Sequence, residues 1–148
     1  MSVSAYWYGQ ALLQALKGTI DLETDPVKVM LTTSSYTPNQ DTHIFKSSVT
    51  GEVSGTGYTA GGKAISNLSM TYTAATNTIT ITGDPVEWAN STITARYAVI
   101  YVDLTGADSV KPLLGYVDFG SDKISSDGLF KIQWHTDGIF KITKQGPV

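Results

Sequence analysis

Short stretches in which every second residue is apolar recur along this chain, and they constrain its fold more than any other feature. In residues 78–82, Ile79 and Ile81 alternate with three threonines. A period of two residues sends successive side chains to opposite faces of a strand, so one face packs inward and the other meets water. Similar or wholly apolar stretches occupy residues 27–31, 68–73, 86–88, 97–102, 113–119, 129–134 and 139–143.

Residues that favour turns separate these stretches. Residues 74–77 have the length of an ordinary hairpin loop, and residues 135–138 end in an Asp-Gly pair that tolerates positive φ. Seven or eight short strands at this spacing in 148 residues are typical of one sandwich or barrel. We predict a single, mainly β domain over residues 1–148, an antiparallel, jelly-roll-like β-sandwich with a short N-terminal helix. Its predicted buried residues are Val27, Val29, Leu31, Ile79, Ile81, Val99, Tyr101, Phe130, Ile132 and Trp134.

The predicted helix covers residues 4–17, before the first stretch of period two. Ser4 is placed to accept a free backbone N–H of the first turn, and Tyr8, Leu12 and Leu16 form one apolar stripe. Gly18 follows, where a left-handed residue often ends a helix.

Aromatic side chains supply the candidate interaction residues. The helical stripe accommodates Tyr8 but leaves Tyr6 and Trp7 pointing elsewhere, either onto the domain or towards a partner. Tyr and Trp are favoured at the centres of protein interfaces. Two long segments without clear periodicity, 33–48 and 51–62, carry further aromatic rings. The predicted interface residues are Tyr6, Trp7, Tyr36, Phe45 and Tyr58, with Trp7 as the principal anchor.

Composition and charge narrow the classes of partner. Only 16% of residues are charged, which suits a surface covered by other subunits, although threonine-rich β domains also carry few charges. The ten Lys and Arg residues are scattered and the net charge is −3, so we predict no nucleic-acid binding. The longest apolar run, 97–102, is far too short to span a membrane, and no signal peptide is visible.

No motif predicts catalysis or a cofactor. The chain has no cysteine and only two histidines, His43 and His135, which nothing in the sequence places together. The glycine-rich segment 55–62 lacks the Lys-Ser/Thr pair of a phosphate-binding loop. Sequence alone gives no distance between the acids Asp84, Glu87, Asp103 and Asp118, which any β-sandwich could offer as a chance glycosidase pair. We therefore predict that the protein is not an enzyme and that it holds no metal and no cofactor.

Five segments together resemble one protein family. They are residues 18–25, 27–43, 52–62 (EVSGTGYTAGG), 88–101 (WANSTITARYAVIY) and 115–120 (GYVDFG). This set is similar to small virion-associated proteins encoded in the structural gene clusters of tailed bacteriophages, and the resemblance covers roughly residues 6–143.

The resemblance implies assembly rather than catalysis. Its favoured implication is a capsid decoration, or cement, protein that is made in the host cytoplasm, resides in the virion and binds the major capsid protein or another virion protein, preferably as a homotrimer. Two alternatives stay open: a neck, tail or fibre-base protein, and, from a different class, a carbohydrate-binding module, which would need exposed aromatic rings.

Overall fold

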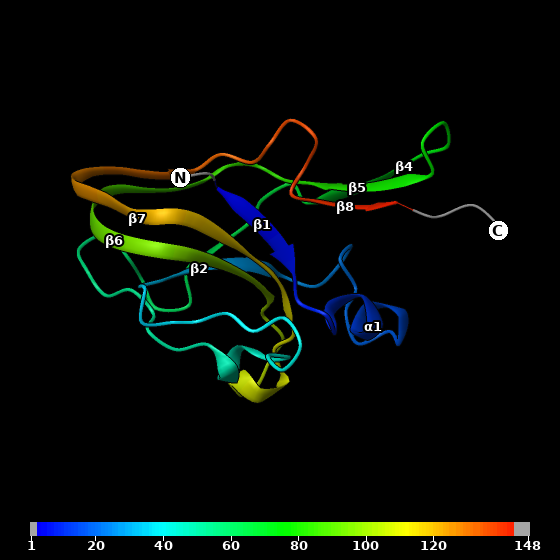
Figure 1. Ribbon diagram of the computed structural model, residues 1–148, viewed down its shortest axis with the longest axis horizontal. Coiled ribbons are helices and arrows are strands. Elements are labelled where there is room, and N and C mark those ends of the chain that lie inside the picture. Colours follow the sequence, from blue (N-terminus) through cyan, green and yellow to red (C-terminus); the bar gives the residue numbers. More distant parts are fainter. Residues whose placement is uncertain (1–2, 144–148) are drawn as a thin grey trace.

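Two antiparallel sheets form the framework of the computed structural model, which describes residues 3–143 (Figure 1). The five-stranded sheet has the order β1-β7-β6-β2-β3, and the three-stranded sheet has the order β4-β5-β8. The strands are β1 (Ser4–Trp7), β2 (Val27–Thr32), β3 (Lys63–Ala64), β4 (Ser69–Thr73), β5 (Thr78–Thr82), β6 (Val86–Val102), β7 (Leu113–Ile132) and β8 (Phe140–Thr143). The helical elements are α1 (Ala11–Leu16) and two 3₁₀ turns, η1 (Lys46–Ser48) and η2 (Asp108–Val110).

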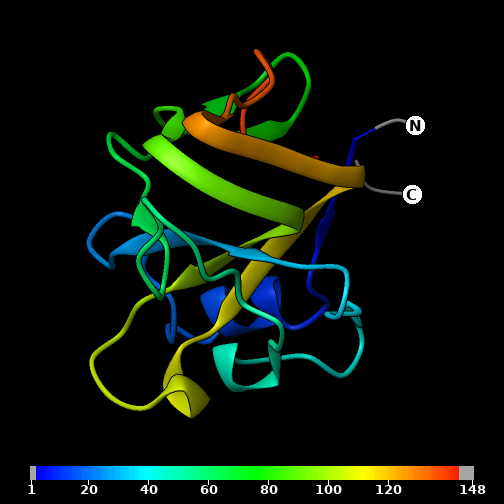
Figure 2. The same ribbon diagram turned by 90° about the vertical axis from the view of Figure 1, so that its left-hand side faces the viewer.

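The predicted antiparallel β-sandwich with a short helix is confirmed, with sheets of five and three strands. Strands β6 and β7 form a long hairpin that runs through the whole molecule, paired from Val86 opposite Ile132 to Tyr101 opposite Leu113. The register shifts between Ala95 and Tyr97, where the four residues 119–122 of β7 stand opposite the single residue Arg96 of β6. Such bulges bend a strand and increase its twist. Figure 2 shows the resulting turn between the two halves of the hairpin.

The core lies between this bent hairpin and the strands that flank it. Its largest fully buried side chain is Trp88, and the rings of Tyr58 and Phe130 pack beside it. Burial of an aliphatic or aromatic side chain contributes about 1.5–3 kcal/mol, so this cluster supplies much of the stability of the fold. Eight of the predicted buried residues are buried: Val27, Val29, Leu31, Ile81, Val99, Tyr101, Phe130 and Ile132.

The prediction of burial was wrong for two residues. Ile79 is 37% exposed, because it lies in the half of β5 that projects beyond the body of the molecule. Trp134 is only partly buried, because it follows the end of β7 in a connecting segment, where its indole Nε1 donates a hydrogen bond to the Asp84 carbonyl oxygen at 2.8 Å.

The predicted helix over residues 4–17 is wrong in its first half. Residues Ser4–Trp7 form strand β1, which pairs with β7 in a register that sets Ser4 opposite Asp118 and Trp7 opposite Gly115. Aromatic side chains favour strands, and the free edge of β7 gives this segment a partner that an isolated helix would lack. Ser4 is therefore not a helix cap. Gly18 does adopt the predicted left-handed conformation, with φ +78°.

Candidate functional site

Two of the predicted interface residues lie on opposite faces of β1. The ring of Trp7 stacks on Phe140 with centroids 4.1 Å apart and packs against the main core. The ring of Tyr6 is 42% exposed and stacks on Tyr116 at 5.2 Å. Trp7 therefore already contributes to the fold of one chain, and its role as an interface anchor stays a prediction. Tyr6 is free to contact a partner along one side of its ring.

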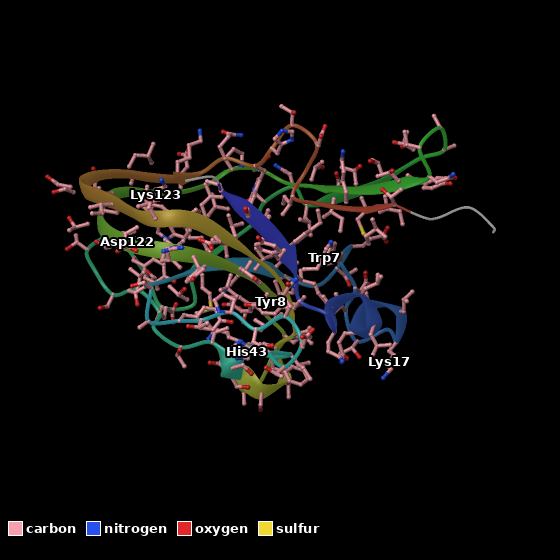
Figure 3. The ribbon with its side chains drawn as sticks, in the orientation of Figure 1. Trp7, Tyr8, Lys17, His43, Asp122 and Lys123 are labelled. Atoms are coloured by element: carbon pink, nitrogen blue, oxygen red, sulfur yellow. The ribbon has the colours of Figure 1, made fainter. Side chains whose placement is uncertain are left out.

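Tyr36, another predicted interface residue, is buried within the single chain, and its role at an interface stays a prediction. Its ring is 1% exposed, and its hydroxyl lies 2.7 Å from that of Tyr8 and 2.9 Å from Nδ1 of His43. The backbone N–H of Asn39 also donates to this Nδ1, so the nitrogen is an acceptor and the chain of donors runs from Tyr8 through Tyr36 to His43. Burial raises the pKa of both tyrosines. Figure 3 labels Tyr8 and His43, the two ends of this chain.

Tyr58, also a predicted interface residue, is partly buried and packs against the core. Its hydroxyl donates to the Glu52 carboxylate at 2.8 Å and accepts the Leu31 backbone N–H at 3.0 Å. The same carboxylate oxygen accepts the N–H of Gly61. Burial raises the pKa of Tyr58. These hydrogen bonds hold the glycine-rich segment 51–62 against β2.

Phe45 is half-buried and forms an isolated bridge with Pro112. It leads into η1, which a group of ion pairs fastens to the β6–β7 connection. Asp103 binds Lys28 at 2.6 Å and Lys111 at 2.7 Å, and Asp108 binds Lys46 at 2.9 Å. Burial alone would raise the pKa of Asp103, but the hydrogen bonds from the two lysines outweigh it and keep that pKa lowered. Ion pairs therefore hold η1 against the β6–β7 connection, and charged side chains occupy this part of the surface.

The histidines and acids that could have suggested catalysis lie apart. His43 belongs to the tyrosine chain, and His135 lies in a turn 3.6 Å from Asp137. Within residues 3–143, no three His, Cys, Asp or Glu side chains gather in a way that could hold a metal ion. The four acids have separate partners: Asn67 for Asp84, Lys131 for Glu87, Lys28 and Lys111 for Asp103, and Arg96 for Asp118.

An apolar concavity of about 710 Å³ lies between β1, the second half of β7 and the segment that leads to β8. Three aliphatic side chains of its wall are largely exposed: Val3 at 58%, Ile124 at 71% and Leu129 at 56%. Phe119 and Trp134 are among the other apolar residues of the wall, and Lys123 also lines it, near the bend of β7 (Figure 3). We call this the concave surface. Periodicity did not reveal it, because its residues come together only through the bend in β7.

A second apolar area lies on the three-stranded sheet, which projects as an arm beyond the body of the molecule (Figure 1). The strand registers set Met70 opposite Ile81 and Tyr72 opposite Ile79, so these four side chains share one face. Ile81 is buried, but Met70 beside it on the edge strand β4 is 40% exposed, and further out Tyr72 is 59% and Ile79 37% exposed. The other face carries threonines from all three strands.

The apolar face of the arm is the one turned towards β1 and α1, because Phe140 of β8 shares it and stacks on Trp7. Helix α1 adds three exposed leucines, Leu12, Leu13 and Leu16, which are 44%, 42% and 78% exposed. We call Met70, Tyr72 and Ile79 the arm surface, and the three leucines form a separate exposed group on α1. Exposed apolar patches of this kind mark sites of protein interaction.

No family model, curated protein or solved structure matches this chain. In the part of the chain that the structure describes, no helix has the length and apolarity to cross a membrane.

Proposed function

We propose that this protein is a structural component of a tailed-phage virion and that it acts as a capsid decoration protein. The observation that supports this best is the pair of uncovered apolar surfaces, one concave and one on the projecting arm. A decoration protein needs two kinds of contact, one with the shell and one with its own copies. The five segments that resemble small virion-associated proteins suggest that these contacts form in a phage particle.

In this proposal the concave surface binds the major capsid protein. Its exposed aliphatic side chains would be buried by a partner. This burial would contribute roughly 25 cal/mol of binding free energy per Å² of apolar area. The protein would be made in the host cytoplasm and would reside in the virion. A homotrimer remains the preferred oligomer, since small decoration proteins commonly sit at symmetry axes. Catalysis, a metal and a cofactor have no part in this role.

Binding to purified shells tests the proposal. Capsids assembled without the protein are mixed with it and pelleted, and bound protein is counted per capsid subunit. We expect binding in proportion to the major capsid protein, and we expect Leu129→Glu to weaken it at least tenfold, because a carboxylate would be buried in the concavity. Val110→Glu is the matched control, since Val110 is similarly exposed, at 46%, but lies outside both apolar surfaces.

Two outcomes would lead away from decoration. If the wild-type protein does not bind shells but is found in a few copies in purified tails or necks, the neck, tail or fibre-base alternative replaces it. If it pellets with insoluble polysaccharides instead, the carbohydrate-binding alternative does. The second outcome has less support: among the described residues, only Tyr6 and Tyr72 are aromatic and more than about a third exposed, and they lie in different sheets.

A further inference from the structure

We infer that the outer edge of β4 pairs with β4 of a second copy of this chain, so that two arms join into one six-stranded antiparallel sheet. Strand β4 is the terminal strand of the three-stranded sheet, with β5 on its inner side. All five of its residues are exposed. The terminal strand of a sheet carries a row of unpaired backbone N–H and C=O groups, which is a template for another strand.

This edge lacks the features by which proteins normally prevent such pairing. Residues Ser69–Thr73 contain no charged residue and no proline, and their pairing with β5 runs without a bulge. Charges, prolines, bulges and very short strands are the usual protections of an edge. Two other edge strands have them: β3 has only two residues and includes Lys63, and β8 carries Lys141. The fourth edge strand, β1, also lacks a charge, but it is shorter, so within residues 3–143 β4 is the longest edge strand without these protections.

The sequence of β4 is nearly symmetric about its central residue, which selects a second copy as the partner. A two-fold axis through Thr71 sets Met70 opposite Tyr72 of the second copy, and Ser69 opposite Thr73 of the second copy. Met70 and Tyr72 lie on the same face of β4, so each exposed ring would cover an exposed thioether across the axis. Sulfur and aromatic rings attract one another at such distances. Because β4 has no charged residue, the pairing brings no like charges together, although the net charge of the chain is −3.

The two-fold contact also preserves the faces of the sheet. Both apolar faces would lie on the same side of the six-stranded sheet and both threonine faces on the other, and the two α1 helices would share the apolar side. Five residue pairs bury less than the roughly 800 Å² per partner of a standard stable interface. We therefore expect a dimer whose population depends on concentration. In a shell, the same contact would link neighbouring trimers, but it does not require the virion function.

Disulfide trapping tests this register directly, because the chain has no cysteine of its own. In Thr71→Cys the two cysteines would face each other across the axis. Opposed residues of antiparallel strands have Cα atoms about 4.5–5.5 Å apart, within the range that a disulfide spans. Met70→Cys is the matched control: it lies on the same edge, but its own copy would be two positions away, too far for a disulfide. We expect Thr71→Cys to form a covalent dimer at least tenfold faster under mild oxidation.

A second variant keeps the test independent of disulfide chemistry. Thr71→Lys places two like charges opposite each other at the axis, so this variant should sediment as a monomer where the wild-type protein forms a dimer. Its melting temperature should stay within a few degrees of the wild-type value, because the side chain is exposed. The inference is overturned if both cysteine variants cross-link at equal rates, if Met70→Cys is the faster, or if Thr71→Lys leaves the oligomer unchanged. It is also overturned if the wild-type protein stays monomeric at every concentration.

Discussion

Replacing Trp7 with alanine separates a folding role from a binding role at the residue that the sequence favoured as an anchor. The ring stacks on Phe140 at 4.1 Å and packs against the core, but it is not fully buried. A fully buried Trp→Ala change costs about 3–5 kcal/mol. For this partly exposed ring we expect about 2–3 kcal/mol of unfolding free energy, including the lost stacking on Phe140 of about 0.5–1.5 kcal/mol.

The assay is thermal and urea unfolding of Trp7→Ala beside its neighbour Tyr6→Ala. A loss of 1 kcal/mol lowers the Tm of a chain of this size by about 2–4 °C, so Trp7→Ala should melt roughly 5–10 °C lower. Tyr6→Ala loses mainly its stacking on Tyr116 and should cost about 1 kcal/mol. Equal melting of Trp7→Ala and wild type, together with loss of capsid binding, would refute the reasoning and restore Trp7 as an outward anchor.

Three further predictions follow from the contacts of the fold. Gly62→Ala should cost about 3 kcal/mol or more, since φ is +77° and its Cβ would collide with a β2 carbonyl, whereas Gly18→Ala, at φ +78° in open space, should cost only about 1–2 kcal/mol by urea unfolding. Tyr36→Phe should lower the unfolding free energy by about 1–3 kcal/mol, because the buried Tyr8 hydroxyl loses its acceptor. The lowered pKa of Asp103 means that its stabilising contribution is full above the ordinary carboxyl pKa and is lost as pH falls through the folded pKa; denaturation at pH 5 and pH 3 should therefore differ more in wild type than in Asp103→Asn.

Much of the fold was predictable because local pattern and tertiary structure agree in the strands. Every stretch of period two or of continuous apolar residues lies wholly or largely in a strand. What the pattern could not show is that residues 86–88 and 97–102 belong to the same strand, β6. The intervening residues 89–96 alternate buried and exposed positions around a left-handed Asn90. A bulge interrupts the period of two there, and periodicity alone then reads one long strand as two short ones.

The prediction of a helix over residues 4–17 was wrong for a related reason. The spacing of Tyr8, Leu12 and Leu16 fits a helical stripe, yet Leu12 and Leu16 are exposed and only Tyr8 is buried. Residues Ser4–Trp7 pair with β7, a strand more than a hundred positions later in the chain. No local signal announces such a partner. The candidate surfaces were hidden in the same way, because the concave surface depends on the bend of β7 and the exposed edge of β4 depends on the order of the strands.

The arm is the part of this molecule that the fold of a single chain explains least. A small isolated sheet is marginally stable in water, and it gains independent stability by packing an apolar face against other elements. Ile81 and Phe140 have such packing, but Met70 and Tyr72 on the edge strand β4 are exposed. Within the monomer the Tyr72 hydroxyl donates an exposed hydrogen bond to Asn77 Oδ1 at 2.8 Å, but neither apolar side chain is well covered. Pairing across the β4 edge would extend the sheet and would cover both side chains at once. The order of the arm and the association of two copies thus depend on the same few residues, so a substitution that blocks association should speed hydrogen exchange in the arm, while global thermal melting changes by no more than a few degrees.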